Sequence, residues 1–122
     1  MLLTCTGRKS GRQFTIPVGY QREGDQVTVM VSEAPKKRWW RNYREAGPVV
    51  LRLRGRELTG IAQRVPPQAE AFSEGAGRAL RRVPGLARVF RLADFDRTSG
   101  LTPEQLEYLR GEIAIVRIDL DR

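Results

Sequence analysis

The sequence predicts a mainly β (α+β) domain over residues 1–122, built as an antiparallel barrel with helices at its rim. Short runs of β-forming residues separated by turn signals fill the first half, and helical patterns come later, followed by one returning strand. A chain of 122 residues, of which 40% are hydrophobic, matches one domain with a packed core.

The first strands are expected over residues 2–6, 13–22 and 27–31. The run at residues 2–6 is an edge or first strand, and Pro17 indicates an edge or bulge position in the second run. The turn residues Glu23-Gly24-Asp25 predict that the second and third runs form a hairpin.

Over residues 35–46 the apolar residues no longer alternate as in a strand. Trp39, Tyr43 and Ala46 are instead spaced so that they would lie on one face of a helix. This pattern predicts an amphipathic helix that Gly47-Pro48 ends. Strands are expected again over residues 49–54 and 57–65, joined by a tight turn at Gly55, and Gly60 suggests a bulge.

Helices are expected over residues 68–83 and 86–92, with a break at Pro84-Gly85. Thr102-Pro103-Glu104-Gln105 is typical of a helix start, and Gly111 ends that helix. The continuous apolar run that opens residues 113–120 predicts a strand buried on both faces at its beginning.

The composition excludes several classes of site. There is no histidine, which removes His-based triads and His-ligated zinc or haem. Cys5 is the single cysteine and is expected to be a small buried residue, so disulfides and Cys-based metal sites are excluded. Asp94 and Asp96 lack further carboxylates at fixed offsets, so no metal site is expected. No membrane span or signal peptide is seen, and we expect a cytoplasmic protein.

Positive charge is concentrated in the first half of the chain. Residues 1–65 contain 13 Lys and Arg against 5 Asp and Glu, whereas residues 66–122 contain nine of each. The partner is therefore expected to be anionic, which leaves nucleic acid, a phosphorylated cofactor and an acidic lipid surface open.

One basic segment lies between the first two strand runs and reads Gly7-Arg8-Lys9-Ser10-Gly11-Arg12. Its two glycines allow backbone N–H groups to converge, while the cations and the hydroxyl suit a phosphate. The alternative interpretation is an exposed hairpin turn with solvated charges.

A second basic segment, residues 35–44, interleaves five cations with three aromatic residues. It suits capture of an anion beside a planar ligand, or equally a helix with an aromatic core face and a solvated basic face. Because Trp39 and Trp40 are adjacent, one of them is expected to line a cleft. A general acid would come from Ser32, Tyr20, Tyr43 or Tyr108, each of which also has a structural interpretation.

At these two segments the chain resembles the deazaflavin (coenzyme F-420)-dependent nitroreductase and quinone reductase family. The resemblance rests on Leu2-Leu3-Thr4-Cys5-Thr6 followed by Gly7 to Gly11, on Pro17 in the next strand, on Ser32, and on Trp39 with Asn42 in a W-x-x-N motif. It implies a split antiparallel β-barrel with flanking helices and a single-domain reductase with 8-hydroxy-5-deazaflavin as cofactor.

The resemblance also implies roles for particular residues. Reduced cofactor would pass hydride to a quinone, activated alkene or nitroaromatic, with Ser32 polarising the acceptor. The residues expected to bind the cofactor are Arg8, Lys9, Ser10, Gly11, Arg12, Pro17, Val31, Lys37, Arg38, Trp39, Trp40, Arg41 and Asn42. The charge bias of the first half agrees with an anionic cofactor.

Two other interpretations stay open from the residues. A basic barrel with interleaved Trp and Arg suits nucleic acid, although aromatic residues on a helix are not a sheet-surface stacking platform. FMN, or a cofactor carried without catalysis, is possible because FMN also presents a phosphate and a planar ring. A homodimer is possible as well.

Overall fold

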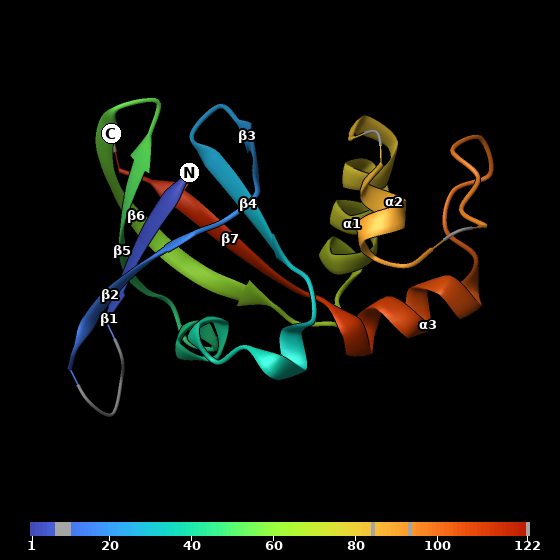
Figure 1. Cartoon of the computed structure of the whole chain (residues 1–122), viewed down its shortest axis with the longest axis horizontal. Helices are drawn as coiled ribbons and strands as arrows, with labels where there is room; N and C mark the ends of the chain where they lie inside the picture. The colour runs from blue at the N-terminus through green and yellow to red at the C-terminus, as the bar shows by residue number, and fades with distance from the viewer. Residues whose placement is uncertain (7–10, 84, 93, 122) are drawn as a thin grey trace.

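A seven-stranded antiparallel sheet forms the centre of the molecule (Figure 1). The computed structural model describes residues 1–6, 11–83, 85–92 and 94–121. The strand order across the sheet is β2-β1-β5-β6-β7-β4-β3. The strands are β1 (Leu2–Thr6), β2 (Gln13–Pro17), β3 (Tyr20–Glu23), β4 (Gln26–Val31), β5 (Gly47–Leu53), β6 (Arg56–Val65) and β7 (Ala114–Leu120).

The connection between β2 and β3 shows why the sheet curls. These two strands are the opposite edges of the sheet, yet only residues 18–19 separate them in the chain. The edges of a flat seven-stranded sheet would lie roughly 29 Å apart, at about 4.8 Å per strand. The stretch from Pro17 to Tyr20 spans about 10 Å when fully extended. The sheet therefore rolls into a half-barrel, as predicted, and the Val18 N–H donates to the Met1 carbonyl at 3.0 Å.

The predicted run over residues 13–22 is two strands and not one. Its first part pairs with β1, with Cys5 opposite Phe14, and its second part forms the hairpin with β4, with Tyr20 opposite Val29. The chain changes partner at Val18-Gly19, so the predicted hairpin holds only for β3 and β4. The first strand, β1, lies between β2 and β5 and is not at an edge.

The expected hairpin of β5 and β6 is confirmed. Its tight turn places Arg54 and Gly55 at positive φ, 50° and 78°. Gly60 does not form a bulge, because its pairing with Val49 and Leu120 continues the regular ladder. A Cβ at Gly60 would lie 2.6 Å from the Asp119 carbonyl oxygen, so close backbone approach explains the glycine.

The concave face of the sheet encloses the first hydrophobic core. Alternate residues of each strand point inward, which follows from the two-residue period of a strand. The largest fully buried side chains of this core come from β1, β4, β5 and β7 and are Leu3, Val27, Val29, Leu51, Val116 and Ile118.

The second core lies on the outer face of the sheet, beneath three helices (Figure 1). These are α1 (Glu70–Arg82), α2 (Leu86–Val89) and α3 (Pro103–Glu112). Phe72, Leu80 and Leu109 pack there with Ile115 of β7. Because Val116, the next residue, faces the barrel, β7 is buried on both sides at its start, as predicted. The predicted helix start at Thr102 is confirmed as a capping box with Gln105.

The predicted helix over residues 35–46 is wrong in type. The structure has two short 3-10 helices, η1 (Ala34–Lys36) and η2 (Trp39–Tyr43), which lie across one end of the barrel (Figure 1). The tighter three-residue turn lets Trp39, Trp40 and Tyr43 all enter the barrel core. None of the described helices is long and apolar enough to cross a membrane.

Candidate functional site

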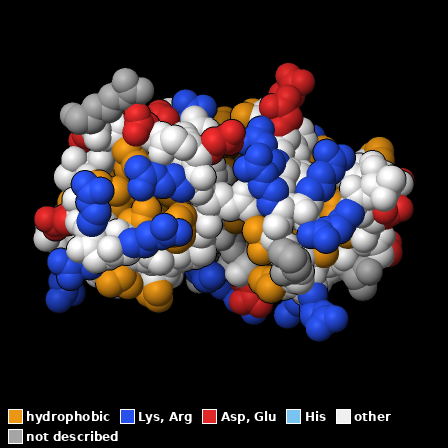
Figure 2. Space-filling model, turned by 90° about the horizontal axis from the view of Figure 1, so that it is seen from above, with side chains coloured by type: hydrophobic (Ala, Val, Ile, Leu, Met, Phe, Trp, Pro, Cys, Tyr) orange, Lys and Arg blue, Asp and Glu red, His pale blue; other side chains and the backbone are white. Residues whose placement is uncertain are grey.

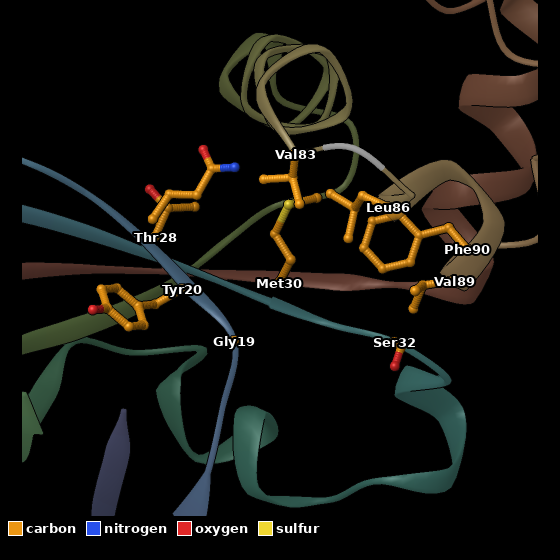
Figure 3. Close-up of a pocket in the computed structure, with 10 residues that line it drawn as sticks. Gly19, Tyr20, Thr28, Met30, Ser32, Val83, Leu86, Val89 and Phe90 are labelled. Atoms are coloured by element: carbon orange, nitrogen blue, oxygen red, sulfur yellow. The ribbon is translucent and has the colours of Figure 1, made fainter.

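A pocket of about 310 Å³ lies between the outer face of β3 and β4 and the α1–α2 connection (Figure 3). Met30 points from β4 toward Val83 and Leu86, and Phe90 closes the same side (Figure 3). Its ten lining residues are Gly19, Tyr20, Gln21, Thr28, Met30, Ser32, Val83, Leu86, Val89 and Phe90, and none of them is charged. Such a pocket suits an uncharged, largely apolar molecule.

Hydroxyl groups on the strands supply the polar character of this pocket. Ser32 lies just after β4 and lines the pocket, as does Thr28, whereas the Tyr20 ring packs against the barrel core and points away from the cavity (Figure 3). Val31 faces the opposite side and is buried in the barrel core, so only its backbone is near the pocket side of the strand. Of the other predicted proton donors, Tyr43 is buried in the barrel and Tyr108 is exposed on α3; neither lines this pocket.

The predicted phosphate loop is described only in part. Arg8, Lys9 and Ser10 lie outside the described residues. Gly11 has a φ of +67° with open space around its Cα, which agrees with a tight turn that a side chain would strain. Arg12 is exposed at the start of β2, whereas Pro17 is at the far end of that strand, opposite Leu2.

The second basic segment forms η2 and the residues before it. Lys37 and Arg38 are exposed, while Trp39 and Trp40 are 8% and 6% exposed. The expectation that one tryptophan lines a cleft is therefore wrong. The Trp40 indole N–H donates to the Ala34 carbonyl at 2.9 Å, and Trp39 contacts Tyr43 edge to face.

An arginine cluster covers Trp40 at the end of the barrel. The guanidinium carbon of Arg64 lies 4.5 Å from the Trp40 ring centroid, and that of Arg41 lies 5.3 Å away. Arg44 also acts electrostatically on Arg64. Asn42, which follows Arg41 within η2, is half-buried. The tryptophans thus offer no free ring face for stacking a nucleic acid base.

Cys5 and Tyr43 lie next to each other in the barrel interior. Burial raises the pKa of the Cys5 thiol, and the neighbouring Tyr43 hydroxyl opposes this more weakly. Burial is also the main reason that the pKa of Tyr43 is raised, with the Cys5 thiol beside it adding to the effect. The Tyr43 hydroxyl has no nitrogen or oxygen hydrogen-bond partner among the described residues. Both groups are therefore kept neutral, and the predicted role of Cys5 as a small core residue is confirmed.

The sequence prediction included Arg44 in the second basic segment but did not single out Arg64 or the helical side of the pocket. Arg64 lies in a strand and reaches Trp40 only through the folded barrel, so no local pattern marks it. For the helical side of the pocket the sequence gives only a weak signal, the apolar residues Val83 and Val89 near the Pro84-Gly85 break. In the structure these two side chains are 37% and 62% exposed. The exposed cations at η2 suit an anionic group, and the uncharged pocket suits an apolar molecule.

Comparison with solved structures shows the fold. A putative pyridoxamine 5'-phosphate oxidase from Listeria innocua has a TM-score of 0.52 at 12% identity, over 99% of this chain and 82% of that chain. An FAD and heme binding protein from Mycobacterium smegmatis has a TM-score of 0.53 at 14% identity, over 98% of this chain and 60% of that one. The fold is thus the split β-barrel. The comparison with curated proteins gives no match.

A family model described as "F420H(2)-dependent quinone reductase" matches residues 1–84. This range covers β1 to β6, both 3-10 helices and α1, and therefore both basic segments and the sheet side of the pocket. The chain accordingly belongs to the F-420-dependent quinone reductase family, a family of oxidoreductases.

Proposed function

We propose that this protein binds reduced deazaflavin coenzyme F-420 and reduces a small acceptor: a quinone, an activated alkene or a nitroaromatic. When bound, the deazaflavin supplies a hydride and is oxidised by two electrons, while the acceptor gains that hydride and a proton from solvent. The acceptor lies in the pocket between β4 and the α1–α2 connection. The observation that carries this proposal is an uncharged pocket that ends at Ser32, within a chain whose family is named for F-420-dependent reduction.

The protein's own part is to hold an anionic cofactor and an apolar acceptor near each other. The basic loop Arg8, Lys9, Ser10, Gly11 and Arg12 binds the phosphate and acidic part of the cofactor, and Lys37, Arg38 and Arg41 add charge at the η2 end. Trp39, Trp40 and Asn42 fix the shape of that end, while Pro17 and the backbone at Val31 bound the space beside the ring. Chain position supports this division, because in the sequence the first group of cations lies between β1 and β2 and the second lies just before or within η2.

Ser32 and the pocket walls act on the acceptor. The Ser32 hydroxyl donates a hydrogen bond to the acceptor oxygen that becomes more negative as reduction proceeds, which is the role of a polarising donor. Met30, Val89 and Phe90 exclude water from the acceptor and strengthen that hydrogen bond. With no charged group in the lining, charged acceptors are disfavoured.

The cofactor proposal is tested by equilibrium binding of oxidised F-420, followed through the cofactor's fluorescence, with FMN as competitor at fixed salt. We expect saturable binding that FMN does not displace. Replacing Arg8 and Lys9 together by alanine should weaken binding about tenfold or more, since charge-assisted hydrogen bonds are lost. Unchanged affinity in this double variant would show that the loop is not part of the cofactor site. Preference for FMN would show that FMN, and not F-420, is the cofactor.

The acceptor proposal is tested by placing a charge in the pocket. Val89→Glu should raise the KM for a naphthoquinone about tenfold or more, because an apolar ligand seated in the pocket would take part of the carboxylate's water away. Ile61→Glu is the matched control, since Ile61 is 43% exposed on β6 and lines no part of this pocket. Equal KM values in the two variants would contradict the assignment.

A further inference from the structure

The barrel end beneath η2 holds three arginines that take part in none of the ion pairs found among the described residues. Arg64 lies on β6 two residues after the buried Ala62, so its side chain leaves the strand on the barrel side and passes over Trp40. Arg41 covers the same indole. Arg44, just after η2, completes a group of three arginines that come from β6 and from η2 with its C-terminal cap.

Abundance of arginine is not what distinguishes this group. Lys and Arg side chains are also spread over the opposite end of the molecule, which Figure 2 views from above. What differs at η2 is that one arginine, Arg64, carries a buried donor, its Nε, with no hydrogen-bond partner among the described residues. None of the ion pairs found in the described part of the chain involves Arg41, Arg44 or Arg64.

The three guanidinium groups oppose one another. Burial lowers the pKa of Arg64 first, and the charges of Arg44 and Arg41 lower it further. An arginine side chain stays protonated in a protein, so this repulsion and the unsatisfied donor both remain as a cost of folding. A bound anion would offset the repulsion and would give the unsatisfied donor a partner, because each guanidinium group offers several N–H donors in a fixed planar arrangement.

We propose that Arg41, Arg44 and Arg64 form an oxyanion subsite at the η2 end of the barrel, with the Trp40 ring holding two of the three guanidinium groups in place. Its ligand carries a phosphate or carboxylate group. This group belongs either to the cofactor or to a separate small anion, since both present the same chemistry to arginine. The subsite does not depend on the proposed function, because it stands on the protein's own charges.

The test titrates inorganic tripolyphosphate into the cofactor-free protein at constant ionic strength, with calorimetry and tryptophan fluorescence as readouts. Both tryptophans are in η2, so binding there should change their emission. We expect saturable binding that Arg64→Gln weakens about tenfold or more. Arg41→Gln and Arg44→Gln should each weaken it about threefold to tenfold. Arg64→Lys keeps the charge but lacks the planar guanidinium group. Its affinity for tripolyphosphate should therefore lie between those of the wild type and Arg64→Gln.

Arg56→Gln is the matched control, because Arg56 is an exposed arginine on the same strand at the opposite end of the barrel. It should bind tripolyphosphate as the wild type does. The proposal would be overturned if no saturable signal appeared. It would also be overturned if Arg56→Gln lost as much affinity for tripolyphosphate as Arg41→Gln and Arg44→Gln do. The conclusion also stands if Arg64→Gln fails to fold, since Arg41 and Arg44 are at the surface.

A competition experiment then identifies the source of the anion. If oxidised F-420 displaces tripolyphosphate, the subsite holds an anionic group of the cofactor. If both bind together without mutual effect, the subsite serves a separate anion. A protein that fails to bind F-420 but binds tripolyphosphate in an Arg64-dependent manner would contradict the proposed function and leave the subsite standing.

Discussion

The two hydrophobic layers of this molecule share strands but differ in how completely they are packed. The barrel interior is closed at its η2 end by Trp39, Trp40 and Tyr43, which are all less than 10% exposed. The outer layer is covered by three short helices that leave a pocket beside β4 and keep Val89 62% exposed. The sheet is therefore stabilised from its concave face, and the incomplete cover on its convex face is available for a ligand.

A single strand shows the difference most directly. Val31 at the end of β4 is in the barrel core, and Ser32 lines the pocket on the other side. The last residue of the strand and the residue that follows it thus serve stability and ligand contact separately. Substitutions can accordingly be chosen that affect one layer and leave the other largely intact.

The largest expected effect on stability comes from truncating one large buried side chain in each layer in turn. Leu51→Ala in the barrel should cost about 2–5 kcal/mol of unfolding free energy, and Phe72→Ala in the outer layer about 3–5 kcal/mol, since both side chains are fully buried. Tryptophan fluorescence reports the barrel and far-ultraviolet ellipticity reports mainly the helices. In Phe72→Ala we expect the ellipticity to be lost at lower urea concentration than the fluorescence, whereas in Leu51→Ala both should be lost together.

Coincident transitions in both variants would contradict this separation and would show that the two layers unfold as one cooperative unit. The comparison requires that each variant first show native fluorescence in the absence of urea.

A smaller effect concerns pH and acts only in the barrel. The pKa values of Cys5 and Tyr43 are raised in the folded protein, so the unfolded chain releases these protons at lower pH than the folded one does. Stability is unaffected below the ordinary thiol pKa and falls as pH rises above it, by at most about 1.4 kcal/mol per pH unit for each proton. Urea unfolding at pH 7, 9 and 10 measures this decline. A Cys5→Ala, Tyr43→Phe double variant should show a flatter decline, and an unchanged slope would exclude this pair as its source.

The smallest effect is confined to the outer layer. Thr102→Ala removes the hydroxyl that accepts from the Gln105 N–H at 3.1 Å and should cost about 1 kcal/mol. Thr102→Ser keeps the hydroxyl and should behave as the wild type. The ellipticity transition in urea is the measurement, and a loss of similar size in the serine variant would show that the methyl group, and not the cap, is responsible.

Local patterns were enough for most of the fold. The β5–β6 hairpin, the helix start at Thr102 and the doubly buried start of β7 follow from alternation, turn chemistry and capping, which act between close neighbours. The failures lie where the chain changes partner. Nothing local distinguishes one long strand over residues 13–22 from two strands bent at Val18-Gly19, because that bend exists only to join the two edges of the curled sheet.

The candidate site divides in the same way. Ser32 and Gly11 stand out locally, one after a clear strand and the other in a basic glycine-containing turn. Arg64 and the pocket wall at Val89 do not, because both depend on contacts between distant parts of the chain. The burial of both tryptophans also escaped prediction, since the helical spacing assumed for η2 allows only one of two adjacent rings to face inward.

The central position of β7 has a consequence for the synthesis of this protein. β7 is the last strand in the chain, yet it pairs with β6 on one side and with β4 on the other. Until residues 114–120 have been made, a nascent chain presents two unpaired strand edges and has no route to a closed sheet. We therefore expect the translating polypeptide to stay open to chaperones and to edge-to-edge association until β7 has emerged, and to acquire its barrel in one concerted event.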